Sequence, residues 1–307
     1  MAEEVKVKNS ILSSPSRIKC GINSGLSCLR KQASRVLMVW IPAFAGMTFI
    51  FISGCTTINP ATGRKEMIWI STPQEISMGE SIHKELSQQF EFSYDSQVLA
   101  RVQSIGAKLA TVSDRQDFQY KFFVIEKDEL NAFTVPSGRI YFYKGLLDKL
   151  VTDDEVAFVL AHEIGHSAAR HTVKKFQASL GYGLLMNLIL SQVGEGAQSV
   201  AGEASGAVMN VVFSAYGRKD EYQADSLGVK YMYLAGYDLQ GAVKALAALE
   251  VEEKKGAGAA GMPLILRTHP FVADRIIAIT NEIALTENKY GTMKVKTAPL
   301  DVIGGEK

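Results

Sequence analysis

Residues 152–171, TDDEVAFVLAHEIGHSAARH, form the stretch of sequence that decides the fold. Thr152 with Glu155 three residues later has the form of a capping box, which typically opens a helix. Apolar residues fill most of the positions between this cap and His162, so the helix is expected to be buried and to run to about residue 171. The whole chain has only five histidines. Two of them four residues apart on one buried helix therefore indicate a specific chemical role.

The spacing of His162 and His166 predicts a metal site on this helix. Residues four apart on an α-helix project about 40° from each other, so both imidazoles can bind one ion. Zinc binds imidazole nitrogen readily, and a catalytic zinc has three protein ligands and one water. Glu163 projects about 100° away from His162, which suits a general base acting on the bound water better than a ligand. The motif thus predicts a hydrolytic centre with one Zn²⁺ per chain.

A third metal ligand has to come from outside this helix. The acidic residues downstream are Glu195, Glu203, Asp220, Glu221 and Asp225. The first two lie in Gly/Ala-rich sequence that fixes no direction for them, whereas the last two share one face of a helix predicted over 217–235. Glu221 is therefore the predicted ligand, and Asp225 is predicted to accept a hydrogen bond from a ligating histidine. The alternative is a solvated acidic face beside the two cations that precede it.

Two further histidines follow the motif. His171 is nine residues after His162, or about 900° around a continuous helix, which predicts that it faces away from the metal. His269 precedes Pro270, which suits the first turn of a helix, so it is expected at an exposed helix start with Arg275 on the following turns. His269 could stabilise the tetrahedral oxyanion formed during hydrolysis or could be a plain helix-start residue, and the sequence favours neither.

The first 54 residues differ from the rest of the chain. A basic segment precedes an apolar run over 36–52, and Ile52-Ser53-Gly54-Cys55 resembles the lipobox of bacterial lipoproteins. This order is typical of an export signal. Residues 1–54 are therefore predicted to be removed, and Cys55 is predicted to be acylated and to attach the protein to a membrane. The alternative is a retained transmembrane anchor, although the apolar run is at the short limit for a span.

The remaining sequence predicts one mostly helical α+β domain. Residues 55–73 are turn-rich and are expected to form a lipidated tether, 74–289 the domain, and 290–307 a C-terminal tail. Strands are predicted at 120–125, 131–135 and 139–143, and helices at 73–90, 95–112, 152–171, 217–235, 238–253 and 270–286. An apolar stretch at 180–190 is too short to cross a membrane and is expected to be a core helix. The net charge of +1 gives no electrostatic case for nucleic-acid binding.

Four segments together resemble the zinc peptidase family that contains HtpX and the CAAX prenyl proteases. They are HEIGH at 162–166, RKDEYQAD at 218–225, Asn131-Ala132-Phe133 followed by Pro136-Ser137-Gly138, and His269-Pro270 with Arg275. The likeness covers about residues 58–286. The periplasmic lipoproteins of this family are the most similar in organisation, and the TGRKE segment at 62–66 is also similar to mitochondrial Oma-type relatives.

The resemblance implies a zincin-like fold with a small mixed β-sheet beside the HExxH helix. It implies that His162, His166 and Glu221 bind Zn²⁺ and that Glu163 is the general base. Asp225 and Arg275 would support these ligands. His269 matches a histidine that in relatives either contacts the transition state or occupies the open coordination site in a resting form.

The resemblance also implies where the substrate binds. The segment Asn131, Ala132 and Phe133 would be the edge strand that receives an extended polypeptide, because a free strand edge offers backbone hydrogen bonds to a substrate. Ser137 stands where the family more often has glycine, which affects only the turn that follows this strand.

The expected function is zinc-dependent endoproteolysis of misfolded or unassembled envelope proteins. The protein would lie in the periplasm of a Gram-negative bacterium, attached to the outer membrane through Cys55, and its oligomeric state is not predicted. One alternative is an envelope chaperone or assembly factor whose zinc is masked by His269. Another is a structural lipoprotein with an inert metal, which is disfavoured unless His269 is a permanent fourth ligand, since structural zinc has four protein ligands.

Overall fold

The computed structural model describes residues 56–191, 204–256 and 262–292. The predicted export signal and the predicted acylation at Cys55 lie outside the described residues, as do Glu195, Glu203 and most of the predicted tail. Among the helices of the described ranges, none has the length and apolarity needed to cross a membrane.

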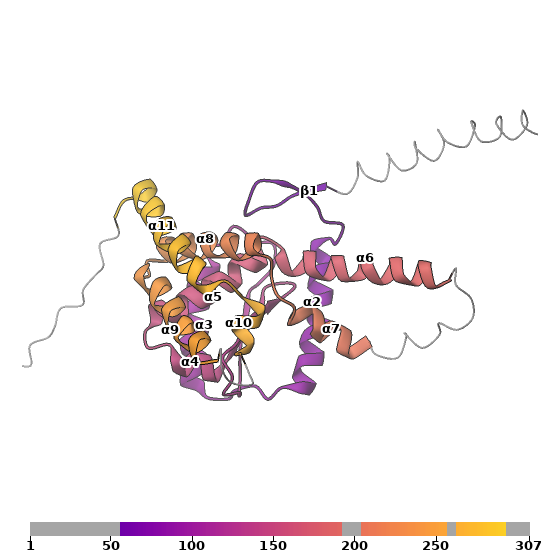
Figure 1. The fold of residues 1–307 in the computed structure, drawn as a ribbon, viewed down its shortest axis with the longest axis horizontal. Coiled ribbons are helices and arrows are strands. Elements are labelled where there is room, and N and C mark those ends of the chain that lie inside the picture. Colours follow the sequence, from indigo (N-terminus) through magenta and orange to yellow (C-terminus); the bar gives the residue numbers. More distant parts are fainter. Residues whose placement is uncertain (1–55, 192–203, 257–261, 293–307) are drawn as a thin grey trace, which may run out of the picture. The chain divides into compact units, whose positions relative to one another are not determined.

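The described residues form a mostly helical α+β domain, as predicted (Figure 1). The strands are β1 (Thr56–Ile58), β2 (Lys65–Met67), β3 (Lys121–Ile125), β4 (Ala132–Val135) and β5 (Arg139–Tyr143). The helices are α2 (Thr72–Gln89), α3 (Ser96–Ala110), α4 (Lys144–Lys149), α5 (Asp153–Ala168), α6 (His171–Ser191), α7 (Ala204–Val212), α8 (Arg218–Ala235), α9 (Gln240–Gly256), α10 (Leu264–Thr268) and α11 (Val272–Tyr290).

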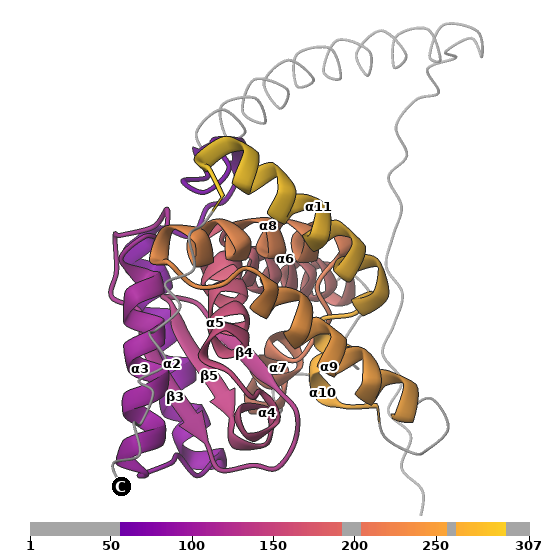
Figure 2. The same ribbon diagram turned by 90° about the vertical axis from the view of Figure 1, so that its left-hand side faces the viewer.

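The three-stranded sheet has the order β3-β5-β4, and it is mixed because β3 runs parallel and β4 antiparallel to β5. Alternate side chains of a strand point to opposite faces. Ile140 and Phe142 therefore join one core with α3 and α5, whereas Phe133 and Tyr141 join a second core with α2 and α7. The prediction of a small mixed sheet beside the HExxH helix is thus confirmed (Figure 2).

Helix α5 is buried over nearly its whole length and packs against α3, α8 and α9. Its N-terminus has the predicted cap, since the Thr152 hydroxyl accepts a hydrogen bond from the backbone N–H of Glu155. Helix α8 approaches α5 closely where Gly165 faces Ala224. A Cβ at Gly165 would lie 2.8 Å from the Ala224 carbonyl oxygen. This close crossing brings the acidic face of α8 to the two histidines of α5.

Helix α5 ends earlier than the sequence predicts. Arg170 has a φ of 58°, a left-handed conformation that a helix cannot continue through. The Arg170 guanidinium lies 3.2 Å from the buried carboxylate of Glu75 on α2, which also pairs with Arg115 at 2.7 Å. The helix predicted to run to about His171 therefore ends at Ala168 instead, and the Arg170–Glu75 ion pair joins the turn that follows it to α2. Helix α6 begins at His171 in a new direction.

The segment expected to be a tether contains a hairpin that packs on the domain. Strands β1 and β2 are antiparallel. The buried side chain of Asn59, in the connection between them, donates a hydrogen bond to the backbone oxygen of Ala169 at 2.8 Å. Ile68 and Ile70 follow β2 and are buried. The hairpin is therefore attached to the domain at the junction of α5 and α6.

Candidate metal centre and active site

Four buried donors meet where α5, α8 and the α10–α11 connection come together. One ligand atom from each of His162, His166, Glu221 and His269 lies within 4.8 Å of all the others. The two Nε2 atoms of His162 and His166 are 3.0 Å apart. Glu221 Oε1 is 3.3 Å from His166 Nε2 and 3.0 Å from His269 Nδ1. His269 Nδ1 is in turn 3.3 Å from His162 Nε2.

These distances are those of ligands around one tetrahedral ion. With metal–ligand bonds of 2.0–2.1 Å, neighbouring ligand atoms of a tetrahedron are about 3.3 Å apart. The Nε2 atoms of His162 and His166 face each other at 3.0 Å, so with both lone pairs directed inward they can bind one cation between them. The nearby Glu221 carboxylate supplies compensating charge. Imidazole and carboxylate donors in this arrangement fit Zn²⁺.

Asp225 and Arg275 hold the His162 side of the centre. Asp225 Oδ1 is 2.8 Å from His162 Nδ1, so this nitrogen donates to the carboxylate and the Nε2 lone pair faces the metal position. Arg275 donates two hydrogen bonds to Asp225, both at 2.7 Å, and its Nη1 lies 2.8 Å from Glu221 Oε2. Asp225 thus lies where the sequence placed it, and Arg275 bridges it to the carboxylate ligand.

His171 holds the His166 side, contrary to the prediction that it faces away. The helix break at Arg170 turns the buried His171 back toward α5, and its Nδ1 lies 3.0 Å from His166 Nδ1. Its Nε2 donates to Gln223 Oε1 at 2.8 Å. This bond leaves the His171 Nδ1 lone pair free to accept from His166 Nδ1–H. His166 Nε2 is then unprotonated toward the metal position, as a ligand must be.

Tyr216 packs on the same histidine and was not found from the sequence. Its ring stacks on His166 with centroids 3.8 Å apart, and its backbone N–H donates to Thr268 O, next to His269, at 3.1 Å. Burial raises the pKa of the Tyr216 hydroxyl well above its usual range. No motif marks this position. The one feature of the sequence that could have pointed to Tyr216 is its position two residues before α8.

His269 is buried, so the expectation of an exposed helix start is wrong. The short helix α10, which the sequence analysis did not predict, ends at Thr268, and α11 begins only at Val272. His269 between them turns inward and supplies the fourth donor. Its Nε2 lies 3.5 Å from Glu163 Oε1. Neither this Nε2 nor the buried Glu163 Oε2 has a hydrogen-bond partner among the described residues.

The surroundings of Glu221 and Glu163 shift the pKa values of their carboxyl groups in opposite directions. Burial acts to raise the pKa of Glu221, but His269 and Arg275 outweigh it and hold the pKa well below the usual range. Glu221 is therefore an anion that can bind a cation. Burial also raises the pKa of Glu163, and His269 and His162 only partly oppose this shift. Glu163 is thus the more basic carboxylate of the two, as a proton acceptor needs to be.

The predicted substrate strand lies beside this centre. Strand β4 pairs only with β5 among the described strands and packs on α5. Asn131, Ala132 and Phe133 are all buried. Phe213, just after α7, packs edge-on against Phe133 with ring centroids 5.2 Å apart. The amide group of Asn131 has no hydrogen-bond partner in the described residues. The strand therefore has the predicted edge position but lies under α7 side chains in this state.

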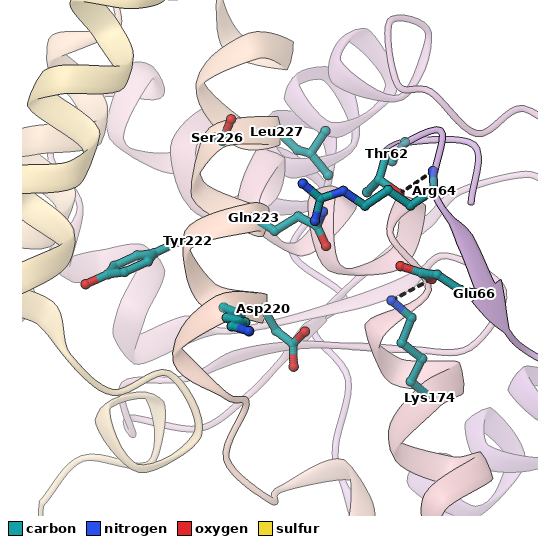
Figure 3. A pocket seen from close by; sticks show the side chains of 11 residues that line it. Thr62, Arg64, Glu66, Lys174, Asp220, Tyr222, Gln223, Ser226 and Leu227 are labelled. Atoms are coloured by element: carbon teal, nitrogen blue, oxygen red, sulfur yellow. Dashed lines mark hydrogen bonds and ion pairs between the residues drawn. The ribbon is translucent and has the colours of Figure 1, made fainter. Parts of the chain in front are cut away.

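Two cavities flank the metal ligands. One of about 20 Å³, enough for a single water, lies between α5, α9 and α10, and His162, Glu163 and His269 are among the residues that line it. The other is an open groove of about 600 Å³ between the β1–β2 hairpin, α6 and α8 (Figure 3). Gln223, the partner of His171, lines this groove. The metal donors themselves are closed to bulk solvent.

An HExxH helix joined by a glutamate from a following helix defines the class of HExxH metallopeptidases with a glutamate ligand. The chain belongs to peptidase family M48: the sequence profile of this family matches residues 96–283, a range that includes every donor described above.

Named relatives agree with this assignment. The chain is 24% identical over 248 residues to the beta-barrel assembly-enhancing protease of Yersinia pestis, which covers 78% of the chain and 50% of the relative. It is 31% identical over 162 residues to the mitochondrial metalloendopeptidase OMA1 of Arabidopsis thaliana, covering 52% of the chain and 31% of the relative. OMA1 of Saccharomyces cerevisiae is 25% identical over 239 residues, which cover 71% of the chain and 66% of the relative. The chain thus spans about a third to two thirds of the length of these relatives.

Proposed function

We propose that this protein is a zinc-dependent endopeptidase. The observation that carries the proposal is the cluster of His162, His166 and Glu221 with ligand atoms at tetrahedral spacing, next to a buried carboxylate, Glu163, that has no partner for one of its oxygens. Zinc bound there would lower the pKa of its water and polarise a scissile carbonyl.

Glu163 is the proposed general base. It takes the proton from the attacking water and delivers it to the leaving amine, so no covalent enzyme intermediate forms. Asp225 and His171 hold the two histidine rings with their Nε2 lone pairs toward the metal position, and Arg275 keeps the Glu221 carboxylate in place. The substrate is an extended polypeptide that pairs with β4 at residues 131–133.

We propose that His269 guards the metal in the resting protein. Its Nδ1 lies among the ligand atoms, so a metal there has four protein donors and no position for water. Cleavage then requires His269 to leave this place. In the open state its unpartnered Nε2, near Glu163, could also donate to the oxyanion.

The proposed substrates are misfolded or unassembled proteins of a bacterial envelope, in a periplasm entered through the export signal at 1–54. The similarity to the beta-barrel assembly-enhancing proteases of Yersinia pestis and Escherichia coli supports this setting. The protein is proposed to be attached to the outer membrane by the acyl chains on Cys55.

The test of the proposed base is the variant Glu163→Gln, which keeps the size of the side chain and removes its basicity. We expect it to bind zinc as the wild type does and to lose cleavage of unfolded casein by a factor of at least about 100, within the usual contribution of a general base. The matched control is Glu155→Gln, a glutamate at the start of the same helix. Wild-type cleavage by Glu163→Gln would show that the base has been misassigned.

The second candidate function is that of an envelope chaperone or assembly factor with a masked zinc. The burial of all four donors favours it over a permanently open protease. Complementation of a strain that lacks the gene distinguishes the two candidate functions. Rescue of its envelope-stress phenotype by Glu163→Gln supports binding as the function, and failure to rescue supports proteolysis.

A further inference from the structure

The outer face of the β1–β2 hairpin is apolar and exposed. The strand register pairs Thr56 with Met67 and Ile58 with Lys65, so these four side chains share one face of the hairpin. Ile58 is 67% exposed and Met67 is 55% exposed. Ile58 and Met67 lie on one face of two adjacent strands, so both side chains can meet the same partner surface.

Trp69, which follows β2, is a third exposed apolar side chain, and it lies beside α6. Ile68 and Ile70 on either side of it are buried, whereas Trp69 itself is 49% exposed. A Cβ on Gly181 of α6 would lie 3.8 Å from the Trp69 ring, and the neighbouring Leu180 is 50% exposed. We call Ile58, Met67 and Trp69 the hairpin patch.

The opposite face fixes how the hairpin is oriented. Glu66 points toward the domain, where it accepts a hydrogen bond from Asn59 at 2.9 Å and pairs with Lys174 of α6 at 2.7 Å. Figure 3 shows this Glu66–Lys174 contact at the groove between the hairpin and α6. The hairpin is therefore tied down on its inner side, and the hairpin patch is held on its outer side.

One cation accompanies the hairpin patch. Lys65 lies on the same face as Ile58, whereas Arg64, which precedes it, lines the groove on the inner side of the hairpin (Figure 3). Exposed apolar side chains, a tryptophan and a cation close together are a combination that binds the interface of an anionic bilayer.

We propose that the hairpin patch docks on the surface of the bilayer that holds the acyl chains of Cys55. Strand β1 begins at the residue after Cys55, so an acylated cysteine would keep the hairpin within a few ångströms of the membrane. One lipid chain alone gives marginal binding, and a second membrane contact makes the attachment stable. Docking would also fix the orientation of the whole domain on the membrane. This inference rests on the proposed lipidation for its location, while the hairpin patch itself does not depend on it.

Trp69 supplies the test. The chain has two tryptophans, so the full chain with Trp40→Phe has Trp69 as its only one. This protein is reconstituted into phosphatidylethanolamine–phosphatidylglycerol vesicles that contain lipids brominated near the headgroup. We expect the Trp69 emission to shift to shorter wavelength and to be quenched. Replacing the patch by Ile58→Ser with Met67→Ser should abolish most of the quenching, whereas Ile277→Ser, an equally exposed isoleucine (65%) on α11, should not.

The outcomes separate docking from lipidation, because acylation of Cys55 is measured independently by mass spectrometry. Quenched Trp69 on an unacylated chain supports docking and rejects lipidation. Unquenched Trp69 at excess lipid, on either form of the chain, overturns the proposal. A blue shift that depends on protein concentration without vesicles also overturns it, in favour of pairing between two copies of the chain.

Discussion

At the scale of single residues, each of the two histidines proposed as metal ligands on α5 has a hydrogen-bond partner at its outer nitrogen. Asp225 serves His162, and His171 serves His166. The two partners differ in charge, since one is a carboxylate held by Arg275 and the other is an imidazole held by the amide of Gln223. The carboxylate strengthens the basicity of His162, while the neutral partner mainly fixes the direction of the His166 ring.

The role of His171 can be tested by comparing two substitutions. His171→Asn keeps a polar atom near the position of Nδ1, whereas His171→Leu removes it at similar volume. We expect His171→Leu to weaken zinc binding by roughly 10–100-fold, the usual effect of losing a group that orients a metal ligand, and His171→Asn to restore much of it. Competition with a chromophoric chelator measures both affinities. Equal zinc affinities for Leu and wild type would show that His171 only fills space.

His269 leads to a second prediction at this scale. If it guards the metal, His269→Ala should keep zinc on the three remaining ligands and cleave casein faster than wild type, because the fourth position becomes open to water. The initial cleavage rate at equal zinc content is the measurement. A slower rate would instead assign His269 to the stabilisation of the oxyanion.

At the scale of elements, the site depends on how closely α5 and α8 cross. Gly165 and Ala224 are the contact point. Glu221 lies three residues before Ala224 on α8, and Asp225 lies one residue after it. A larger side chain at the contact would push α8, and with it the carboxylate ligand, away from both histidines.

The substitution Gly165→Ala tests this crossing. Its Cβ would meet the backbone oxygen of Ala224 at 2.8 Å, so the helices have to separate. We expect the strain to outweigh the gain in helix propensity and to destabilise the domain by about 1–3 kcal/mol, with weaker zinc binding. Thermal unfolding with and without zinc measures both effects. Gly183→Ala on α6, where an added Cβ has no neighbour within 4 Å, is the control. An unchanged melting temperature for Gly165→Ala would contradict the predicted clash.

Helical spacing was sufficient to predict that His162 and His166 share one face of α5 and that Glu221 and Asp225 share one face of α8, because each pair is four residues apart within one element. It was insufficient for His171. The chain there has no glycine or proline, and the turn at Arg170 is joined to Glu75 on a distant helix. His269 was singled out by its place before Pro270 and again by the family resemblance, but its burial depends on α10, a short helix with little periodicity. Sequence patterns thus predict contacts within an element better than contacts that two elements impose on each other.

At the scale of the whole molecule, the metal centre joins parts of the chain that are far apart in sequence. His162 and His166 come from α5, Glu221 from α8, and His269 from the connection between α10 and α11. A zinc ion bound by all of them would cross-link the helical half of the domain. The same α5 packs beside β4, so the strand proposed to receive substrate and the metal keep a fixed relation to each other.

The most direct test of the account is the zinc affinity of the full chain beside that of Glu221→Ala, with Asp220→Ala as the neighbouring control. We expect one zinc ion per chain for wild type and control. For Glu221→Ala we expect a loss of zinc affinity of more than about 100-fold, since removing a ligand exceeds the effect of removing a group that orients one. A wild-type chain without zinc, or Glu221→Ala with unchanged affinity, would contradict this account.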